Sequence, residues 1–154
     1  VDGLFFPIWL IDPQRQEIWA FSWHASELNR WFGVGINVID KLPAAADWNL
    51  ETGTRNIPLH PHNWVVEIIV ETGVFGLVAM LMSIGYFLAK WARGYLTTGD
   101  PALLAVVGVW AAYWAASLFS VSYWSSWLQV SFLLATVICL AGRQISTRSP
   151  ELLH

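Results

Sequence analysis

The stretch from Pro101 to Gly142 constrains the fold most, because it contains no charged residue. About 20 predominantly apolar residues cross the hydrocarbon core of a bilayer once, and this stretch is about twice as long. It is therefore expected to cross the membrane, turn back and cross again. The turn is expected at 120–127, where serines mix with Tyr and Trp residues, which favour the headgroup level. This predicts membrane spans near 103–119 and 126–142.

A third span is expected earlier in the chain. The run from Thr72 to Ala89 is uncharged and is followed by Lys90 and Arg93, which are basic anchors typical of a membrane boundary. Its helix is expected to begin near Trp64, which gives a span near 64–90. The prediction is an all-α integral membrane protein, with about three transmembrane helices in the region 64–142.

Charge divides the chain into two halves. Charged residues make up only 12% of the sequence, against ~25% in soluble domains. Residues 1–71 hold nine acidic and four basic residues, whereas 72–154 hold two acidic and four basic ones. The net charge of −3 and the lack of a basic cluster exclude nucleic-acid binding. The single cysteine, Cys139, excludes an internal disulfide.

The region 1–63 is predicted to be a long loop with short helices, because Pro and Gly interrupt it repeatedly. The best helix candidate is Glu17–Trp31, where apolar residues recur at spacings of three and four. Leu4–Ile11 is apolar but too short to span alone, so 1–11 is either the remnant of a preceding membrane helix or contains an interfacial piece.

Basic residues that flank the predicted spans give an orientation. Lys90 and Arg93 lie on one side, and Arg143 and Arg148 lie on the same side two crossings later. The positive-inside rule makes this side cytoplasmic, so 143–154 is predicted to be a cytoplasmic tail. Residues 1–63 then lie on the outer face, which is the periplasm for the inner membrane of a Gram-negative bacterium.

The densest group of reactive side chains is His60-Pro61-His62-Asn63, where the loop enters the first membrane helix. A neutral histidine can accept a proton from an attacking hydroxyl. An equal alternative is a helix start capped by Asn63, with both histidines merely exposed. A metal site that also uses His24 is a weaker alternative, because this spacing lacks the paired ligands of zinc motifs.

Arginines near the outer surface are candidate diphosphate ligands, because a guanidinium offers paired charge-assisted hydrogen bonds. Arg15 is the first candidate, although the residues alone favour an ordinary interfacial arginine at this position. Arg30 and Arg55 carry the same ambiguity, and a surface role is favoured for each. Gly33-Val34-Gly35 lacks the context of a phosphate loop and predicts a tight turn.

The order of these motifs resembles the O-antigen ligase and polymerase superfamily. The resemblance covers roughly Arg15 to Leu77, and the later spans fit only generically. It rests on the following segments in this order: Arg15-Gln16-Glu17-Ile18-Trp19, Trp31-Phe32-Gly33-Val34-Gly35, His60-Pro61-His62-Asn63 and Glu71-Thr72-Gly73-Val74-Phe75-Gly76.

The resemblance implies a metal-independent membrane glycosyltransferase without a cofactor. Such an enzyme moves a glycan from an undecaprenyl diphosphate carrier to an acceptor hydroxyl on lipid A core, a growing polysaccharide or a protein, at the periplasmic face. His62 or His60 would be the general base, and Arg15 would hold the diphosphate. Asn63, Arg55 and Arg30 would contact substrate. Structural support would come from Glu71, Gly73, Gly76, Gly33 and Gly35.

The sequence also departs from that family. Its members have more spans and a further upstream periplasmic arginine, neither of which has a counterpart here. This indicates a C-terminal fragment, and the activity of this chain alone stays open. The alternative function is a non-enzymatic membrane component of a polysaccharide export or assembly system. The residues do not separate a ligase from a polymerase.

Overall fold

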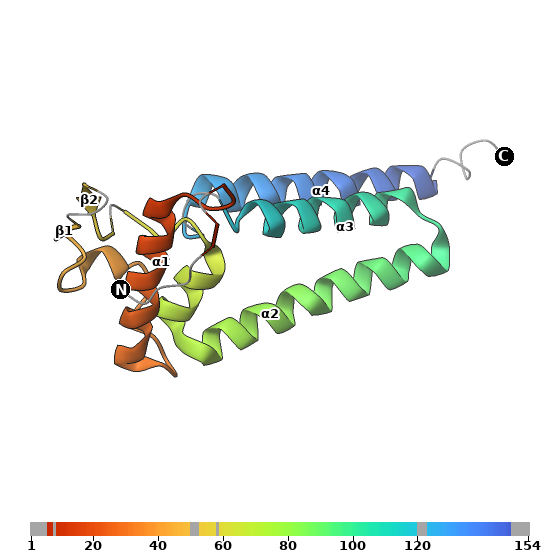
Figure 1. Cartoon of the computed structure of the whole chain (residues 1–154). Helices are drawn as coiled ribbons and strands as arrows, with labels where there is room; N and C mark the ends of the chain where they lie inside the picture. Colours follow the sequence, from red (N-terminus) through yellow and green to blue (C-terminus); the bar gives the residue numbers. More distant parts are fainter. Residues whose placement is uncertain (1–5, 8, 50–52, 58, 120–122, 149–154) are drawn as a thin grey trace. The chain divides into compact units, whose positions relative to one another are not determined.

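The structure is a computed structural model that describes residues 6, 7, 9–49, 53–57, 59–119 and 123–148 (Figure 1). It is mainly helical, which confirms the helical part of the predicted fold class. The elements in chain order are α1 (Pro13–Ser26), η1 (Glu27–Asn29), η2 (Ile39–Lys41), β1 (Trp48–Asn49), β2 (Thr54–Arg55), α2 (Trp64–Thr98), α3 (Pro101–Ala116) and α4 (Ser126–Arg148). The strands β1 and β2 pair antiparallel, with Trp48 opposite Arg55.

The chain forms two compact units. The first comprises Val1–Met80 and Ser117–Trp124, and the second comprises Leu81–Ala116 and Ser125–His154. The first unit therefore contains α1, the small strands and the beginning of α2.

Helix α1 begins earlier than the sequence periodicity predicted. Asp12 caps it by accepting a hydrogen bond from the Gln14 amide at 2.8 Å, and Pro13 occupies the first turn. Both residue types suit these positions, because a cap needs an acceptor side chain and proline lacks an amide that would need a partner. The helix also ends earlier than predicted, at Ser26, where the chain continues as the short helix η1.

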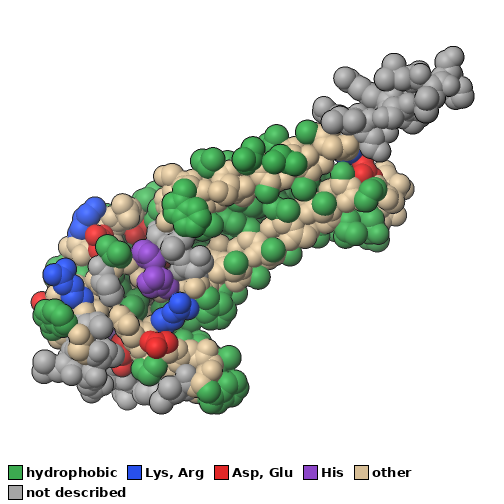
Figure 2. Space-filling view, turned by 90° about the horizontal axis from the view of Figure 1, so that it is seen from above, with side chains coloured by type: hydrophobic (Ala, Val, Ile, Leu, Met, Phe, Trp, Pro, Cys, Tyr) green, Lys and Arg blue, Asp and Glu red, His purple; other side chains and the backbone are tan. Residues whose placement is uncertain are grey.

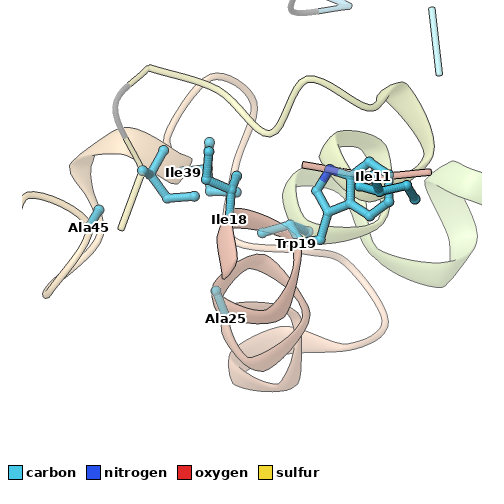
Figure 3. Close-up of a cluster of buried hydrophobic side chains, with 8 residues drawn as sticks. Ile11, Ile18, Trp19, Ala25, Ile39 and Ala45 are labelled. Atoms are coloured by element: carbon cyan, nitrogen blue, oxygen red, sulfur yellow. The ribbon is translucent and has the colours of Figure 1, made fainter. Parts of the chain in front are cut away.

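The core of the first unit forms where α1 packs against the loop and α2 (Figure 3). Ile18 lies towards Ile39, and Trp19 lies towards Ile11. The buried cluster consists of Ile11, Ile18, Trp19, Ala25, Ile39, Ala45, Ile57 and Val70. Burial of these side chains stabilises α1, since a solitary helix of this length is marginal in water.

Helix α2 is broken at Gly73, whose φ of 69° and ψ of −170° are not helical. The break leaves backbone amides and carbonyls on both sides of it without partners inside the helix. The loop segment 30–35 provides these partners. The Val34 amide donates to the Val70 carbonyl at 2.9 Å, and the Val74 amide donates to the Arg30 carbonyl at 2.9 Å. The flanking pairs are Gly35 to Glu71 at 3.0 Å and Phe75 to Trp31 at 3.3 Å.

Two glycines make this contact possible. A Cβ atom on Gly33 would overlap the Glu71 backbone, and a Cβ atom on Gly73 would overlap the Trp31 backbone. Both glycines also have a positive φ, which L side chains rarely adopt. Each glycine therefore lets the other segment approach, and we call this contact the Gly33–Gly73 crossing.

The second unit is built around α3 and α4, with aromatic rings packed between its helices. Tyr113 stacks on Phe132 at 4.0 Å between ring centroids, and Trp110 contacts Trp91 at 4.7 Å. Asp100 caps α3 by accepting from the Ala102 amide at 2.9 Å and also accepts from Arg143 Nε at 2.8 Å. In the face that Figure 2 shows, hydrophobic side chains form patches along the length of these helices.

Within the described residues, α2 and Ser126–Arg143 of α4 are long and apolar enough to cross a membrane. The part of α2 after the break, 74–98, extends ~37 Å at ~1.5 Å per residue and exceeds the ~30 Å of the hydrocarbon core. Helix α3 is apolar but has only 16 residues, which extend ~24 Å. Three membrane-spanning helices therefore remain a prediction.

The close backbone contact at the Gly33–Gly73 crossing predicts that Gly33→Ala and Gly73→Ala each destabilise the protein. A left-handed conformation costs a non-glycine residue ~1–2 kcal/mol, and the overlap with the opposite backbone adds to this. The readout is the unfolding temperature of the purified protein in detergent. Gly85→Ala is the control, because nothing lies within 4 Å of a Cβ atom there. Equal unfolding temperatures for all three variants would contradict a tight crossing.

Candidate functional site

A pocket of about 380 Å³ lies in the first unit and brings together two residues predicted as functional from the sequence, Arg15 and His62. This volume falls in the range of small-ligand sites, ~300–1,000 Å³. Among the described residues, its lining consists of Leu10, Ile11, Asp12, Gln14, Arg15, Ile18, His62 and Phe119. The lining is polar on the side of the α1 start and the histidine, and apolar where Leu10, Ile11, Ile18 and Phe119 contribute.

Helix α1 positions both Arg15 and His62. It does so through residues that lie within one and a half turns of each other. Arg15 lines the pocket, and Ile18 lies partly in the pocket wall and partly in the core. Trp19 donates a buried hydrogen bond from Nε1 to the Pro61 carbonyl at 2.8 Å. The helix that carries Arg15 therefore also holds the loop that carries His62.

The side chain of Gln16 holds the segment that contains Leu10 and Ile11, two residues of the pocket wall. Its Nε2 donates to the carbonyls of Phe6 and Ile11, each at 2.9 Å. Its Oε1 accepts from the Phe6 amide at 2.9 Å. These bonds fix the chain on both sides of Leu10, so the apolar wall of the pocket is tied to α1.

The two histidines of the loop contact each other, with ring centroids 4.1 Å apart. His62 lines the pocket, whereas His60 is not among the lining residues. His62 adopts a φ of 56°, in the left-handed region. Such a backbone costs a non-glycine residue ~1–3 kcal/mol and is found most often at functional sites.

His60 is neutral at physiological pH. Burial, and secondly the proximity of His62, lower the pKa of His60 from 6.5 to about 4. Its Nδ1 is buried and has no hydrogen-bond partner among the described residues. A neutral ring suits this environment, because a charge placed there would lose its hydration.

Asn63 caps α2. Its side-chain oxygen accepts from the Val65 amide at 2.9 Å and from the Val66 amide at 3.2 Å. The helix-cap alternative considered from the sequence thus describes these contacts of Asn63, which is not among the described pocket-lining residues. The cap fixes the chain directly after His62.

Glu71 is a buried carboxylate, 1% exposed, that holds two other segments. It accepts from the amides of Asn37 at 2.8 Å and Val38 at 3.2 Å, and from the indole Nε1 of Trp124. Among the described residues, neither histidine of the loop belongs to these partners. Glu71 therefore joins α2, the turn after Gly35 and the segment 123–124.

Glu67 lies one helical turn earlier and is equally buried, at 1% exposed. Its Oε2 accepts from the Tyr123 amide at 2.7 Å. The sequence placed Glu67 next to Glu71 on one helical face, but it gave no indication of their common partner segment. The two carboxylates attach 123–124 to the start of α2.

The remaining predicted site residues lie away from the pocket lining. Arg30 is exposed and forms an ion pair with Glu27 at 3.8 Å, and Arg55 is exposed on β2. Gly35 adopts a φ of 116° in the turn held by Glu71, and a Cβ atom on Gly76 would overlap the Thr72 side chain. The contacts described for Arg30, Gly35 and Gly76 are structural.

Six of the described pocket residues, among them Asp12, Gln14 and Phe119, were not identified as site residues from the sequence. Asp12 could have been found, because Asp-Pro is a helix-start signal that places it in the same turn as Arg15. Phe119 follows α3 and contacts Trp19 at 6.5 Å between ring centroids, a long-range contact without a local signal. In the described part of the chain, no group of three or more His, Cys, Asp or Glu side chains could hold a metal ion.

The lowered pKa of His60 predicts a pH-dependent stability. Between pH 6.5 and about 4 the unfolded chain binds a proton at this histidine and the folded chain does not. Stability therefore falls as the pH falls through this window. Unfolding temperatures at a series of pH values should show a smaller acid loss for His60→Phe than for the unaltered protein. Identical pH dependence would contradict a neutral, buried His60.

Comparison with known proteins agrees with this geometry. Residues 11–81 match the model of the family described as O-Antigen ligase. No curated protein and no solved structure matches the chain. The matched segment contains α1, the histidine loop and the Gly33–Gly73 crossing, and it includes the motifs on which the resemblance was based. Residues 11–81 of the chain are therefore similar to the O-antigen ligase family.

Proposed function

We propose that the protein is a membrane glycosyltransferase of the O-antigen ligase or polymerase type. It transfers a glycan from an undecaprenyl diphosphate carrier to an acceptor hydroxyl at the periplasmic face of the inner membrane. The acceptor is lipid A core, a growing polysaccharide or a protein. The observation that carries this proposal is the common pocket of Arg15 and His62.

The pocket offers the two groups that this transfer needs. The acceptor oxygen attacks the anomeric carbon of the glycan, and the bond from that carbon to the diphosphate oxygen breaks. A neutral histidine takes the proton of the acceptor hydroxyl. A guanidinium stabilises the charge that develops on the leaving diphosphate, and its planar fork suits paired phosphate oxygens. His62 and Arg15 have these roles in the proposal.

Pocket position favours His62 over His60 as the base. His62 lines the pocket, while His60 lies behind it with a buried Nδ1. The pKa of about 4 also makes His60 a weak proton acceptor, since an efficient general base has a pKa near the working pH. His60 then serves to position the His62 ring, with which it is in contact.

Glycan transfer by variants of the full-length protein tests these roles. His62→Ala should lower the transfer rate ~10²–10⁴-fold, the usual contribution of a general base. His60→Phe should retain measurable transfer. His24→Ala is the matched control, because His24 lies exposed on α1, and it should leave transfer unchanged. Normal transfer by His62→Ala, with normal amounts of protein in the membrane, would exclude His62 as the base.

The arginine is tested by a conservative pair of variants. Arg15→Ala should abolish transfer, whereas Arg15→Lys should retain part of it, because lysine keeps the charge but loses the planar fork. Transfer is measured against the concentration of the lipid-linked donor, and membrane insertion is checked in parallel. If Arg15→Ala transfers glycan at the normal rate, the diphosphate role is wrong.

A further inference from the structure

We infer that Trp31, Phe32 and Phe75 form a lipid-contacting surface, which we call the aromatic anchor, and that it sits at the headgroup level of the membrane. The three side chains are 57%, 69% and 56% exposed. Their rings nevertheless contact one another. Phe75 lies 5.6 Å from Trp31 and 5.3 Å from Phe32 between ring centroids. Large apolar side chains that cluster on a surface indicate an interaction site.

The anchor is held rigidly, because it flanks the Gly33–Gly73 crossing. The Phe75 amide donates to the Trp31 carbonyl at 3.3 Å, and the Val74 amide donates to the Arg30 carbonyl at 2.9 Å. Trp31 and Phe32 thus belong to the loop, Phe75 belongs to α2, and backbone hydrogen bonds join the two segments. The exposure of these rings is therefore a fixed property of the fold.

Continuity with the apolar helix identifies lipid as the occupant. Phe75 lies in the first turn after the break, at the beginning of the 74–98 part of α2. Val78, three residues later and hence on the same face, is also exposed, at 45%. Trp and Phe are favoured at the boundary between lipid and water, and the exposed Glu27–Arg30 ion pair beside the anchor suits the headgroup layer.

The anchor changes one expectation from the sequence, which placed the loop at 12–63 in the periplasm. The tip at Trp31–Phe32 would instead enter the membrane surface. Because the crossing fixes this tip to Gly73, the break in α2 would lie at the same depth. The helix start 64–72 and the buried Glu67 and Glu71 would then lie outside the hydrocarbon core, on the side of the proposed reaction. This inference rests on α2 crossing the membrane.

Depth-dependent quenching of fluorescence tests the anchor. In a Cys139→Ser background, Trp31→Cys is labelled with an environment-sensitive fluorophore and the full chain is reconstituted into phospholipid vesicles. The lipids carry nitroxide quenchers either at the headgroup or in the acyl chain. Phe32→Cys is a second anchor variant. Val78→Cys on α2 reports on membrane crossing, and Trp48→Cys, an equally exposed tryptophan on β1, is the water-facing control.

Strong quenching of the Trp31 and Phe32 labels by headgroup nitroxides, with little quenching of the Trp48 label, is expected. If the Val78 label is quenched and the two anchor labels behave like Trp48, the anchor is wrong while α2 still crosses the membrane. Blue-shifted emission of the anchor labels without quenching would show that protein covers them, and this also overturns the inference. An unquenched Val78 label would overturn it together with the crossing of α2.

Discussion

The hydrogen bonds at the Gly33–Gly73 crossing are the interaction on which the first unit depends. A break in a helix leaves amides and carbonyls without partners, and burial of such groups costs free energy comparable to a lost hydrogen bond. Here the carbonyls of Val70 and Glu71 accept from the loop, and the amides of Val74 and Phe75 donate to it. The long loop and the membrane helix therefore determine each other's conformation.

Two buried carboxylates extend this arrangement to a third segment. A carboxylate that is 1% exposed needs donors to replace water. Glu71 finds them at Asn37, Val38 and Trp124, and Glu67 finds one at Tyr123. Residues 123–124, between α3 and α4, are thereby attached to the start of α2, and Phe119 of the same connection lines the pocket. A residue far along the sequence becomes part of the site through these bonds.

Local signals in the sequence predicted the local structure. Asn63 indicated the start of α2, and the uncharged stretches indicated apolar helices. The start of α1 was missed because the apolar spacing was weighed above the Asp12-Pro13 signal. Long-range relations could not be predicted: Gly33 was predicted to lie in a turn and Gly73 in a helix, and nothing in the spacing showed that they touch. Likewise, Arg15 and His62 were each identified as candidates, but only the fold shows that they share a pocket.

The strained backbone of His62 follows from this construction. Its φ of 56° persists because both neighbours are held. Before it, the Pro61 carbonyl accepts from Trp19, and after it, Asn63 caps α2. These two restraints come from helices that are anchored independently, α1 by its buried Ile18 and Trp19, and α2 by the crossing. The backbone of His62 is thus held by the middle of α1 and the start of α2, which is the rigid support that the proposed proton acceptor requires.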